Sequence, residues 1–397
     1  MRIALIADTF PPTRTSGAVQ MRDLSREFIR QGHKLTVMLP TSNLTLPWSI
    51  EDFDGFQLVR LRAPKTKDIG YVRRTINEFL MPFAMLRNLR KSPLANQRWD
   101  GVVWYAPSIF FGPIISALKS FSNCKSYLII RDIFPEWAVD IGLMSRGLPY
   151  WFFKAIANYQ YSVADVIGIQ TKGNEIYFSN RKDCQIEVLQ NWLTDAPNLG
   201  CSISVSNTVL SGRTIFVYAG NMGVAQDMDL LIDLAERLLN RVDIGFLFVG
   251  RGRDAQRLQE YAEARGLFNV VFFDEIDPSE VPGLYAQCHI GIVALDSRHK
   301  THNIPGKFLS YMQAGLPVLA SINPGNDLEE MILREKVGRV CSNHSIDTLQ
   351  CLAIDLVDEV VGKTANKQAL SARCKALSAK FFSPEIAVKQ IISALAS

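Results

Sequence analysis

A glycine followed by a lysine at the start of a predicted helix could bind a phosphate group. Gly306 and Lys307 open a short helix within HNIPGKFLSYMQAGLPVLAS (residues 302–321), and Gly315 ends it before an apolar strand. The first amides of a helix lack an intrahelical acceptor and attract anions together with the helix dipole. Lys307 would add a mobile positive charge beside them. The plainer interpretation is an ordinary helix–strand connection with a glycine C-cap.

A second glycine-containing loop, YAGNMGVAQ, follows the predicted strand 214–218. Glycines between a strand and a helix let the backbone approach a diphosphate, so the two motifs together favour a nucleotide diphosphate as ligand. The chain lacks G-x-G-x-x-G, and no acidic residue ends the next predicted strand, 244–249, which argues against NAD. The candidate binding residues here are Gly220, Asn221, Met222, Gly223, Gln226, Gly250 and Arg251.

Two acidic residues beside this loop could bind a metal ion. Asp227 and Asp229 flank the start of the following helix. Acidic side chains at a helix start more often cap amides and complement the dipole. We therefore predict that no metal is bound.

Two loops in the first half place polar residues at the carboxyl ends of predicted strands. In DTFPPTRTSGAVQ (residues 8–20), Ser16 and Gly17 either complete a long N-cap loop or face a ligand, and both interpretations stay open. After the strand 126–130, Asp132 and Glu136 are candidate catalytic carboxylates. The alternative is that one of these acids only neutralises Arg131.

The elements that must position these residues alternate between short apolar strands and helices, which predicts parallel sheets. The polar, small-residue stretch 194–213 has no periodicity, and the alternation restarts after it. We therefore expect two doubly wound α/β domains, residues 1–195 and 196–383, with a last helix starting at Ser383-Pro384. In such sheets, ligands bind outside the carboxyl ends of the strands.

Charge is unevenly distributed along the 397 residues, which carry a net charge of +4. Residues 60–98 contain 10 basic and 2 acidic residues, and the segments 71–92 and 150–161 mix basic with aromatic and aliphatic side chains. Such segments are typical of anionic membrane surfaces, although two core helices with solvated basic ends would look similar. No nucleic-acid-binding motif accompanies the charge. Seven scattered cysteines, an N-terminal strand and the lack of a long apolar run predict a cytoplasmic protein.

The order of these motifs resembles that of retaining glycosyltransferases of family 4. The first loop, the segment RQGHKLTVM, residues 220–226, the VGRG at 249–252 and the motif at 302–321 follow each other as in that family. The last motif is most similar to bacterial O-antigen enzymes that transfer N-acetyl-L-fucosamine from a UDP donor. The resemblance implies a GT-B fold, with two Rossmann-like domains facing a cleft and the C-terminal helix (residues 384–397) returning to the first domain.

The resemblance also implies roles for individual residues. Lys307 and the glycine loop would bind the diphosphate. His302 would meet the sugar. The remaining nucleotide-sugar contacts would come from Glu275, Ile276, Asn303, Ile304, Pro305, Gly306 and Ser310.

The chain departs from the family at several of these positions. Most members carry glutamates where His302 and Ser310 stand, and Arg and Lys where Asn221 and Gln226 stand. A serine hydroxyl holds a ribose more weakly than a carboxylate does. With two cations missing from the donor loop, Lys307 and the helix N-termini must bind more of the diphosphate charge.

The implied function is metal-independent, retaining transfer from a UDP-sugar to an undecaprenyl-diphosphate-linked saccharide, with no separate cofactor. The enzyme would then lie at the inner face of the bacterial cytoplasmic membrane, and nucleic acid would not be a partner. Two alternatives remain: a UDP-sugar 2-epimerase, and a non-catalytic nucleotide-sugar-binding protein.

Overall fold

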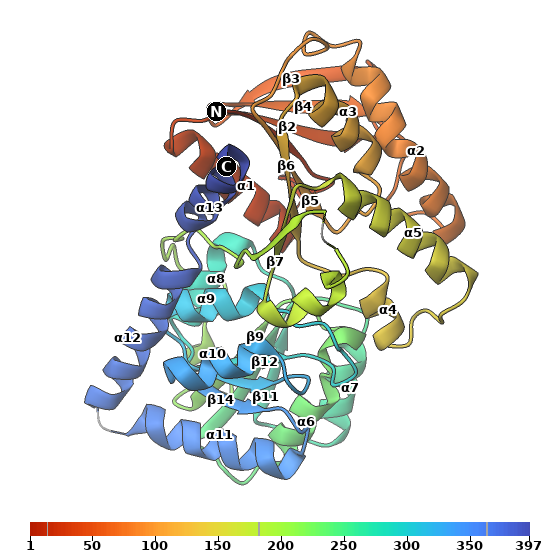
Figure 1. Ribbon diagram of the computed structural model, residues 1–397. Coiled ribbons are helices and arrows are strands. Elements are labelled where there is room, and N and C mark those ends of the chain that lie inside the picture. Colours follow the sequence, from red (N-terminus) through yellow and green to blue (C-terminus); the bar gives the residue numbers. More distant parts are fainter. Residues whose placement is uncertain (14, 182, 363) are drawn as a thin grey trace. The chain divides into compact units, whose positions relative to one another are not determined.

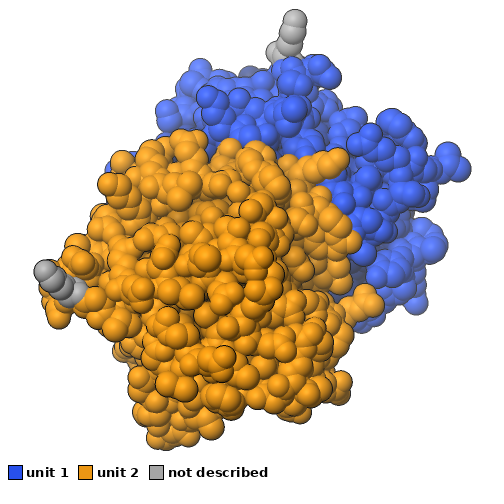
Figure 2. Space-filling model, turned by 90° about the horizontal axis from the view of Figure 1, so that it is seen from below, with its two compact units in different colours: residues 1–192, 384–397 blue, residues 193–383 orange. Residues whose placement is uncertain are grey.

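The computed structural model describes residues 1–13, 15–181, 183–362 and 364–397, which form two compact units. Unit 1 comprises residues 1–192 and 384–397, and unit 2 comprises residues 193–383 (Figure 2). Each unit contains one sheet with helices on both of its faces (Figure 1). The prediction of two doubly wound α/β domains is thereby confirmed.

Unit 1 is built on an eight-stranded sheet with the order β3-β4-β2-β1-β5-β6-β7-β8. All neighbouring strands are parallel except the edge pair β3 and β4. The strands are β1 (Arg2–Ile6), β2 (Lys34–Thr41), β3 (Trp48–Phe53), β4 (Phe56–Arg62), β5 (Gly101–Ala106), β6 (Lys125–Ile130), β7 (Val166–Ile169) and β8 (Gln185–Val188). The helices are α1 (Ser16–Arg30), α2 (Tyr71–Leu89), α3 (Gly112–Ser122), α4 (Glu136–Asp140), α5 (Leu148–Val163), a 3₁₀ helix (Lys172–Phe178) and α13 (Pro384–Ala396).

The two faces of the unit 1 sheet are covered by different helices. Apolar side chains of α2, α3 and α5 form one buried cluster, and those of α1 and α13 form the other. The C-terminal helix therefore returns to the first domain, as predicted. It packs beside α1, and the Gln31 side chain donates a hydrogen bond to the Glu385 carbonyl (3.1 Å).

Unit 2 contains a fully parallel six-stranded sheet with the order β11-β10-β9-β12-β13-β14. The strands are β9 (Thr214–Ala219), β10 (Ile244–Val249), β11 (Val270–Phe273), β12 (Ile290–Ala294), β13 (Val318–Ser321) and β14 (Gly338–Cys341). The helices are α6 (Asp229–Arg237), α7 (Ala255–Ala264), α8 (Val281–Tyr285), α9 (Gly306–Ala314), α10 (Asp327–Glu335), α11 (Ile346–Val361) and α12 (Thr364–Phe381), with 3₁₀ helices at Val205–Asn207, Val224–Gln226 and Pro278–Glu280.

Two apolar layers flank the unit 2 sheet. Helices α8, α9 and α10 pack on one face, and α6, α7 and α11 pack on the other. Helix α9 ends at Gly315, whose φ of +77° is the left-handed conformation of a C-cap glycine. The sequence-predicted helix–strand connection is therefore present as expected.

Two features differ from the sequence-based expectations. The boundary between the units lies between Trp192 and Leu193, three residues before the predicted one, and the whole stretch 194–213 belongs to unit 2, because Ile203, Val205 and Leu210 are buried in its core. The sequence of this segment shows no regular spacing of apolar residues, because its backbone forms no strand and only one short 3₁₀ helix. Strand β3 is absent from the sequence-based expectations, since none of its six residues is fully buried at the edge of the sheet beside β4. No helix among the described residues is long and apolar enough to span a bilayer.

Candidate functional site

The carboxyl edge of the unit 2 sheet has its switch point at β9. The chain passes from β9 to β10 on one side, and β12 lies against β9 on the other side. Loops after β9 and β12 therefore leave the sheet in opposite directions, which opens the usual ligand crevice of doubly wound sheets. The first of these loops contains residues 220–223, and the second leads into α9 and Lys307.

Glycine is required where the loops after β9 and β10 meet. A Cβ atom on Gly250 would lie 2.1 Å from the Gly220 carbonyl oxygen, and one on Gly252 would lie 2.1 Å from the Met222 carbonyl oxygen. Both glycines also have φ near +150°, at +146° and +153°. The Met222 amide donates to the Arg251 carbonyl (2.9 Å), so the two loops form one backbone layer at the strand ends. Neither Gly220 nor Gly250 adds a side chain of its own to this layer, which lets a ligand approach the backbone there.

Lys307 reaches back from α9 to the strand that carries this loop. Its Nζ donates a 2.6 Å hydrogen bond to Tyr218 Oη and lies 3.9 Å from the centre of the Tyr218 ring. Tyr218 Oη in turn donates to the Asn221 carbonyl (2.6 Å). A Cβ atom on Gly220 would lie 3.8 Å from Lys307 Nζ, so the ammonium is next to the glycine loop.

The Lys307 ammonium has aromatic and hydroxyl neighbours but no carboxylate partner in the described part of the chain. Loss of hydration lowers the pKa of Lys307 to about 7, although the residue as a whole is only half-buried. The same burial raises the pKa of Tyr218, which keeps its hydroxyl neutral. Lys307 is therefore poised to gain a proton when an anion is placed beside it.

Gln226 shapes the glycine loop from within. Its Oε1 accepts hydrogen bonds from the Gly223 amide (3.1 Å) and from Asn221 Nδ2 (3.4 Å). The Met222 side chain is buried and contributes its backbone only. These predicted binding residues therefore position the loop amides, and they supply no positive charge for a diphosphate.

The segment before α9 carries the other predicted sugar contacts. His302 Nδ1 lies 3.2 Å from Asp327 Oδ1, which fixes its ring. Asn303 Oδ1 is buried without a hydrogen-bond partner among the described residues. Ser310 Oγ donates to the Gly306 carbonyl (3.3 Å), so its lone pairs alone remain for a ligand.

Four further predicted residues of unit 2 make structural contacts. Ile304 is buried in the core, and Pro305 is the N-cap of α9, so both set the backbone path. Arg251 and Glu275 form an ion pair of 3.0 Å that links the loops after β10 and β11. Ile276 packs against the unit 2 core.

The acidic pair near the glycine loop is engaged by basic side chains. Asp229 accepts hydrogen bonds from Arg257 (2.6 and 2.9 Å), and this pairing lowers the pKa of Asp229. Asp227 lies 3.4 Å from His344 Nδ1. Among the described residues, no three His, Cys, Asp or Glu side chains gather as metal ligands would.

The first loop of unit 1 packs against the end of β5. A Cβ atom on Gly17 would lie 3.0 Å from Tyr105 Oη, so glycine permits this close approach. Thr15 caps α1 by accepting a hydrogen bond from the Ala18 amide (3.2 Å). Ser16 is exposed. The N-cap interpretation of this loop is therefore confirmed for Thr15, and the exposed Ser16 keeps the ligand interpretation open.

Asp8, at the end of β1, is a candidate that the sequence reasoning missed. Its Oδ1 is buried and has no hydrogen-bond partner among the described residues. Burial raises the pKa of Asp8, although Lys67 and Arg74 oppose this effect. Its only sequence signal is a charge that interrupts an apolar strand.

Arg131 turns away from the acids that follow it. Its guanidinium donates to the Leu189 carbonyl (2.9 Å) and lies 4.7 Å from the centre of the Trp192 ring, and burial lowers its pKa to about 10. Asp132 reaches solvent, but surrounding protein raises its pKa against the influence of Arg131. Asp132 therefore remains available to a ligand.

Glu136 is held beneath the surface. Its side chain is 9% exposed, and one carboxylate oxygen accepts a hydrogen bond from Lys154 Nζ. This ion pair joins α4 to α5. The position favours a structural contact for Glu136 rather than contact with a substrate.

The predicted residues thus form two groups, one at each sheet's carboxyl edge. The unit 2 group brings together the glycine loop, Lys307 and the segment before α9. Sequence reasoning missed Tyr218 and Asp327, because no local pattern links either residue to a partner far along the chain.

The second unit matches a known family. Residues 213–359 match the family model of glycosyl transferases group 1. The matched region includes the glycine loop, the switch point at β9 and Lys307.

Two curated proteins are similar to the chain. It is 24% identical over 230 residues to the probable glycosyltransferase WbjE of Pseudomonas aeruginosa, which covers 55% of this chain and 56% of WbjE. It is 26% identical over 226 residues to the putative colanic acid biosynthesis glycosyl transferase WcaI of Escherichia coli, which covers 50% of this chain and 52% of WcaI. The matches thus span about half the length of these curated relatives.

The fold matches solved structures over the whole chain. A UDP-forming α,α-trehalose-phosphate synthase from Burkholderia xenovorans, solved with glucose-6-phosphate, superimposes with a TM-score of 0.72 at 12% identity and full coverage of both chains. The chain has a GT-B-like fold with two Rossmann-like domains, as the sequence resemblance implied.

Proposed function

We propose that the protein is a glycosyltransferase that moves a sugar from a UDP-sugar to a lipid-linked saccharide in bacterial surface-polysaccharide synthesis. The observation that carries the proposal is the pairing of Lys307 with the glycine loop after β9, inside the region that matches glycosyl transferases group 1. The similarity to WbjE and WcaI, both named as glycosyltransferases, and to the UDP-forming synthase supports it.

In this proposal, Lys307 and backbone amides bind the donor diphosphate. The amides come from Asn221 and from the start of α9, whose dipole also favours an anion, because the amides of Gly220, Met222 and Gly223 already donate to acceptors within the protein. Negative charge grows on the diphosphate as its bond to the sugar breaks. Preorganised donors aimed at such charge are typically worth about 10²–10³ in rate each.

The sugar is assigned to the segment before α9. The buried Asn303 Oδ1 would accept a hydrogen bond from a sugar hydroxyl, which removes the cost of its unsatisfied burial. His302, held by Asp327, is the neighbouring polar group. These two side chains stand at the start of the family-specific motif, and the donor we favour from it is UDP-N-acetyl-L-fucosamine.

Transfer would retain the anomeric configuration. The acceptor hydroxyl attacks the anomeric carbon on the face that UDP leaves, the new C–O bond forms as the C–O bond to the diphosphate breaks, and the leaving phosphate takes the hydroxyl proton. The chain would need no nucleophile for this step, and the cationic Lys307 with the loop amides would balance the charge without a metal.

The acceptor is assigned to the carboxyl edge of the unit 1 sheet. Asp132 reaches solvent there, and Asp8 and Tyr105 end neighbouring strands. We place the enzyme at the inner face of the cytoplasmic membrane, because the acceptor is carried by a lipid and unit 1 has a basic, aromatic segment at 71–92.

The test is a transfer assay on the full chain. Individual UDP-sugars are incubated with lipid-linked N-acetylglucosamine, and products are identified by mass spectrometry and by the anomeric NMR coupling. We expect acceptor-dependent UDP release with retention, undiminished by EDTA. An epimer formed without acceptor would identify a 2-epimerase instead, and UDP binding without any turnover would identify a binding protein.

A further inference from the structure

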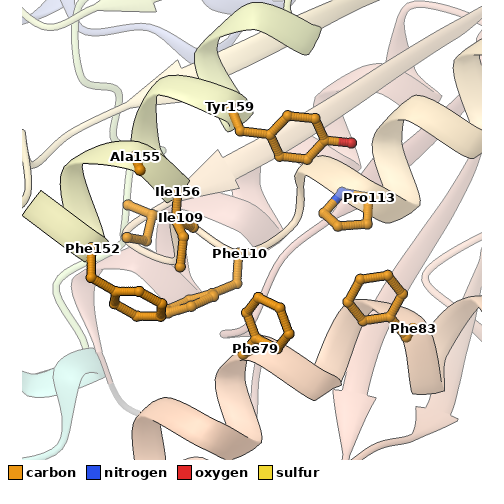
Figure 3. Close-up of a pocket in the computed structure, with 9 residues that line it drawn as sticks. All are labelled: Phe79, Phe83, Ile109, Phe110, Pro113, Phe152, Ala155, Ile156 and Tyr159. Carbon is orange, nitrogen blue, oxygen red and sulfur yellow. The ribbon is translucent and has the colours of Figure 1, made fainter.

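Unit 1 contains an apolar groove of 460 Å³ between helices α2, α3 and α5. In Figure 3, Phe79 and Phe83 point from α2 toward side chains of α5 and of the turn that precedes α3. The only polar side-chain atom in its lining is the Tyr159 hydroxyl. The lining residues are Phe79, Phe83, Ile109, Phe110, Pro113, Phe152, Ala155, Ile156 and Tyr159.

Both long helices that border the groove carry exposed apolar side chains along one face. The α2 positions are separated by three or four residues, as one helix face requires, and α5 repeats this pattern. The exposed fractions are 77% for Val72, 55% for Ile76, 47% for Phe79, 46% for Leu80, 49% for Phe83, 87% for Leu148, 61% for Trp151, 44% for Phe152 and 46% for Tyr159. Contiguous exposed apolar surface of this kind marks a binding site.

The groove begins at the carboxyl edge of the unit 1 sheet. Ile109 and Phe110 belong to the loop that leaves β5 at that edge. Phe110 contacts Phe153, which contacts Phe134 in the loop after β6 (ring centroids 6.4 and 5.2 Å apart). An aromatic wall therefore connects the groove to the strand ends where the acceptor saccharide is assigned.

Cationic side chains lie in the loop before α2 and in the first turn of this helix. The Lys67 ammonium donates to the Asp8 carbonyl (3.2 Å), and the charges of Lys67 and Arg74 act on the Asp8 carboxyl. Arg73 is exposed and forms no ion pair with the described residues. Positive charge thus lies beside the polar strand ends, at the start of the helix that carries Phe79 and Phe83.

We propose that this groove binds the hydrocarbon chain of the acceptor lipid, a polyprenyl chain, while Lys67 and Arg73 contact its diphosphate. The inference rests on the proposed function, because the lipid-linked diphosphate is the acceptor named there. Unit 1 thus has an apolar groove, cationic side chains and polar strand ends at one edge of its sheet, which match the hydrocarbon, diphosphate and saccharide of such an acceptor.

A single chain fits this site better than the surface of a bilayer does. The volume of 460 Å³ falls within the range of about 300–1,000 Å³ of small-molecule pockets, and Ile109 and Phe110 at its floor are only 4% exposed. A flat membrane surface would contact exposed side chains of α2 and α5 such as Val72 and Trp151, and it would not reach the buried Ile109 and Phe110.

The experiment measures binding of farnesyl diphosphate and inorganic diphosphate to the full chain by calorimetry, with excess UDP to occupy the nucleotide site. We expect farnesyl diphosphate to bind at least about tenfold more tightly, since burying on the order of 60 Å² of apolar surface suffices for that ratio. Ala155→Trp fills the groove without adding polarity and should abolish the difference. Ala264→Trp, at an exposed position on α7, is the matched control and should preserve it.

A second pair of variants separates loss of the groove from loss of the fold. Thermal unfolding is measured for each variant. Phe152→Ser removes apolar lining and should weaken farnesyl diphosphate binding several-fold, whereas Phe121→Ser, at a similarly exposed phenylalanine of α3, should not. Equal binding of the two probes by the unaltered protein, or an Ala155→Trp variant that keeps the difference, would overturn the inference. So would an Ala155→Trp effect confined to binding of phosphatidylglycerol vesicles, which would identify a bilayer contact. Because these experiments measure binding and no sugar transfer, their result can be interpreted even if the protein proves not to be a glycosyltransferase.

Discussion

The protonation of Lys307 should couple UDP binding to pH. Burial lowers the pKa of Lys307 from 10.5 to about 7, so at pH 8 the free protein holds this side chain mostly neutral beside Tyr218. A bound diphosphate favours the ammonium form and draws a proton from solution. The dissociation constant of UDP should then rise about tenfold per pH unit above pH 7, because protonating Lys307 costs about 1.4 kcal/mol more for each pH unit above its pKa.

The ligand itself does not produce this dependence. A terminal phosphate loses its last proton near pH 6, so UDP has a constant charge at pH 7.5 and above. Calorimetric titrations at pH 7.5, 8 and 9, in buffers of different ionisation enthalpy, should therefore show uptake of close to one proton per UDP at the upper end. A flat affinity without proton uptake would refute the assignment.

Lys307→Met removes the titrating group without removing its aliphatic volume. At pH 7 the variant should bind UDP about 10–100-fold more weakly, the equivalent of about 1.5–3 kcal/mol for a charged hydrogen bond, and the pH slope should vanish. Lys367→Met makes the same change at an exposed position on α12 and should leave both affinity and slope intact. A variant that keeps the slope would place the titrating group elsewhere.

The free energy of unfolding should also depend on pH through the lowered pKa of Lys307. Between pH 7 and 10.5 the unfolded chain carries a proton on Lys307 that the folded chain lacks, so the free energy of unfolding rises with pH across this window. Below pH 7 the cost of burying the charge is fully present, with an upper limit of about 5 kcal/mol. Lys307→Met should lack this rise in urea unfolding and should be more stable than the parent at pH 7.

Three further substitutions probe the contacts around the two sites. Tyr218→Phe removes the hydroxyl that Lys307 donates to and should weaken UDP binding about fivefold in calorimetry, with little change in melting temperature, as expected for a hydrogen bond worth about 1 kcal/mol. Gly250→Ala places a Cβ 2.1 Å from a backbone oxygen at a φ of +146°. This variant should lower the free energy of unfolding by more than about 1 kcal/mol and abolish UDP binding. The control Gly266→Ala, at a φ of +64° with open space around it, should lower the free energy of unfolding by about 1 kcal/mol and keep UDP binding. Glu136→Gln leaves Lys154 charged without its carboxylate and should cost about 3–5 kcal/mol in urea unfolding, and the double replacement by Leu and Met should recover most of that loss; equal stability of the single and double variants would show that the pair is not coupled.

The pairing of the two motifs in unit 2 could be predicted from the sequence because parallel sheets impose it. Both Gly220 and the segment before Lys307 follow apolar strands, and the carboxyl ends of parallel strands share one edge. What the sequence leaves open is the strand order, which makes β9 and β12 neighbours. The contact between Lys307 and Tyr218 depends on that order and spans 89 residues.

The groove of unit 1 illustrates the opposite case. Helix α2 has apolar residues on two faces, one with Met81 and Met85 in the core and one with Phe79 and Phe83 exposed. Periodicity identifies such a segment as helical but cannot say which apolar face lacks a partner. The core-helix interpretation is therefore confirmed for one face of α2, and the membrane-facing interpretation stays a prediction for its exposed face.

The residues at positions 302 and 310 bear on how Lys307 works. The resemblance to family 4 would place carboxylates there, but this chain has His302 and Ser310, and the Ser310 hydroxyl donates to the Gly306 carbonyl. A carboxylate near Lys307 would hold it protonated at all physiological pH values, and its pKa would rise. Without one, the low pKa follows from dehydration alone, and the donor diphosphate must supply the missing negative charge. Introducing a glutamate at position 310 should therefore raise the pKa of Lys307 and flatten the pH dependence of UDP binding, while the ribose gains a stronger acceptor.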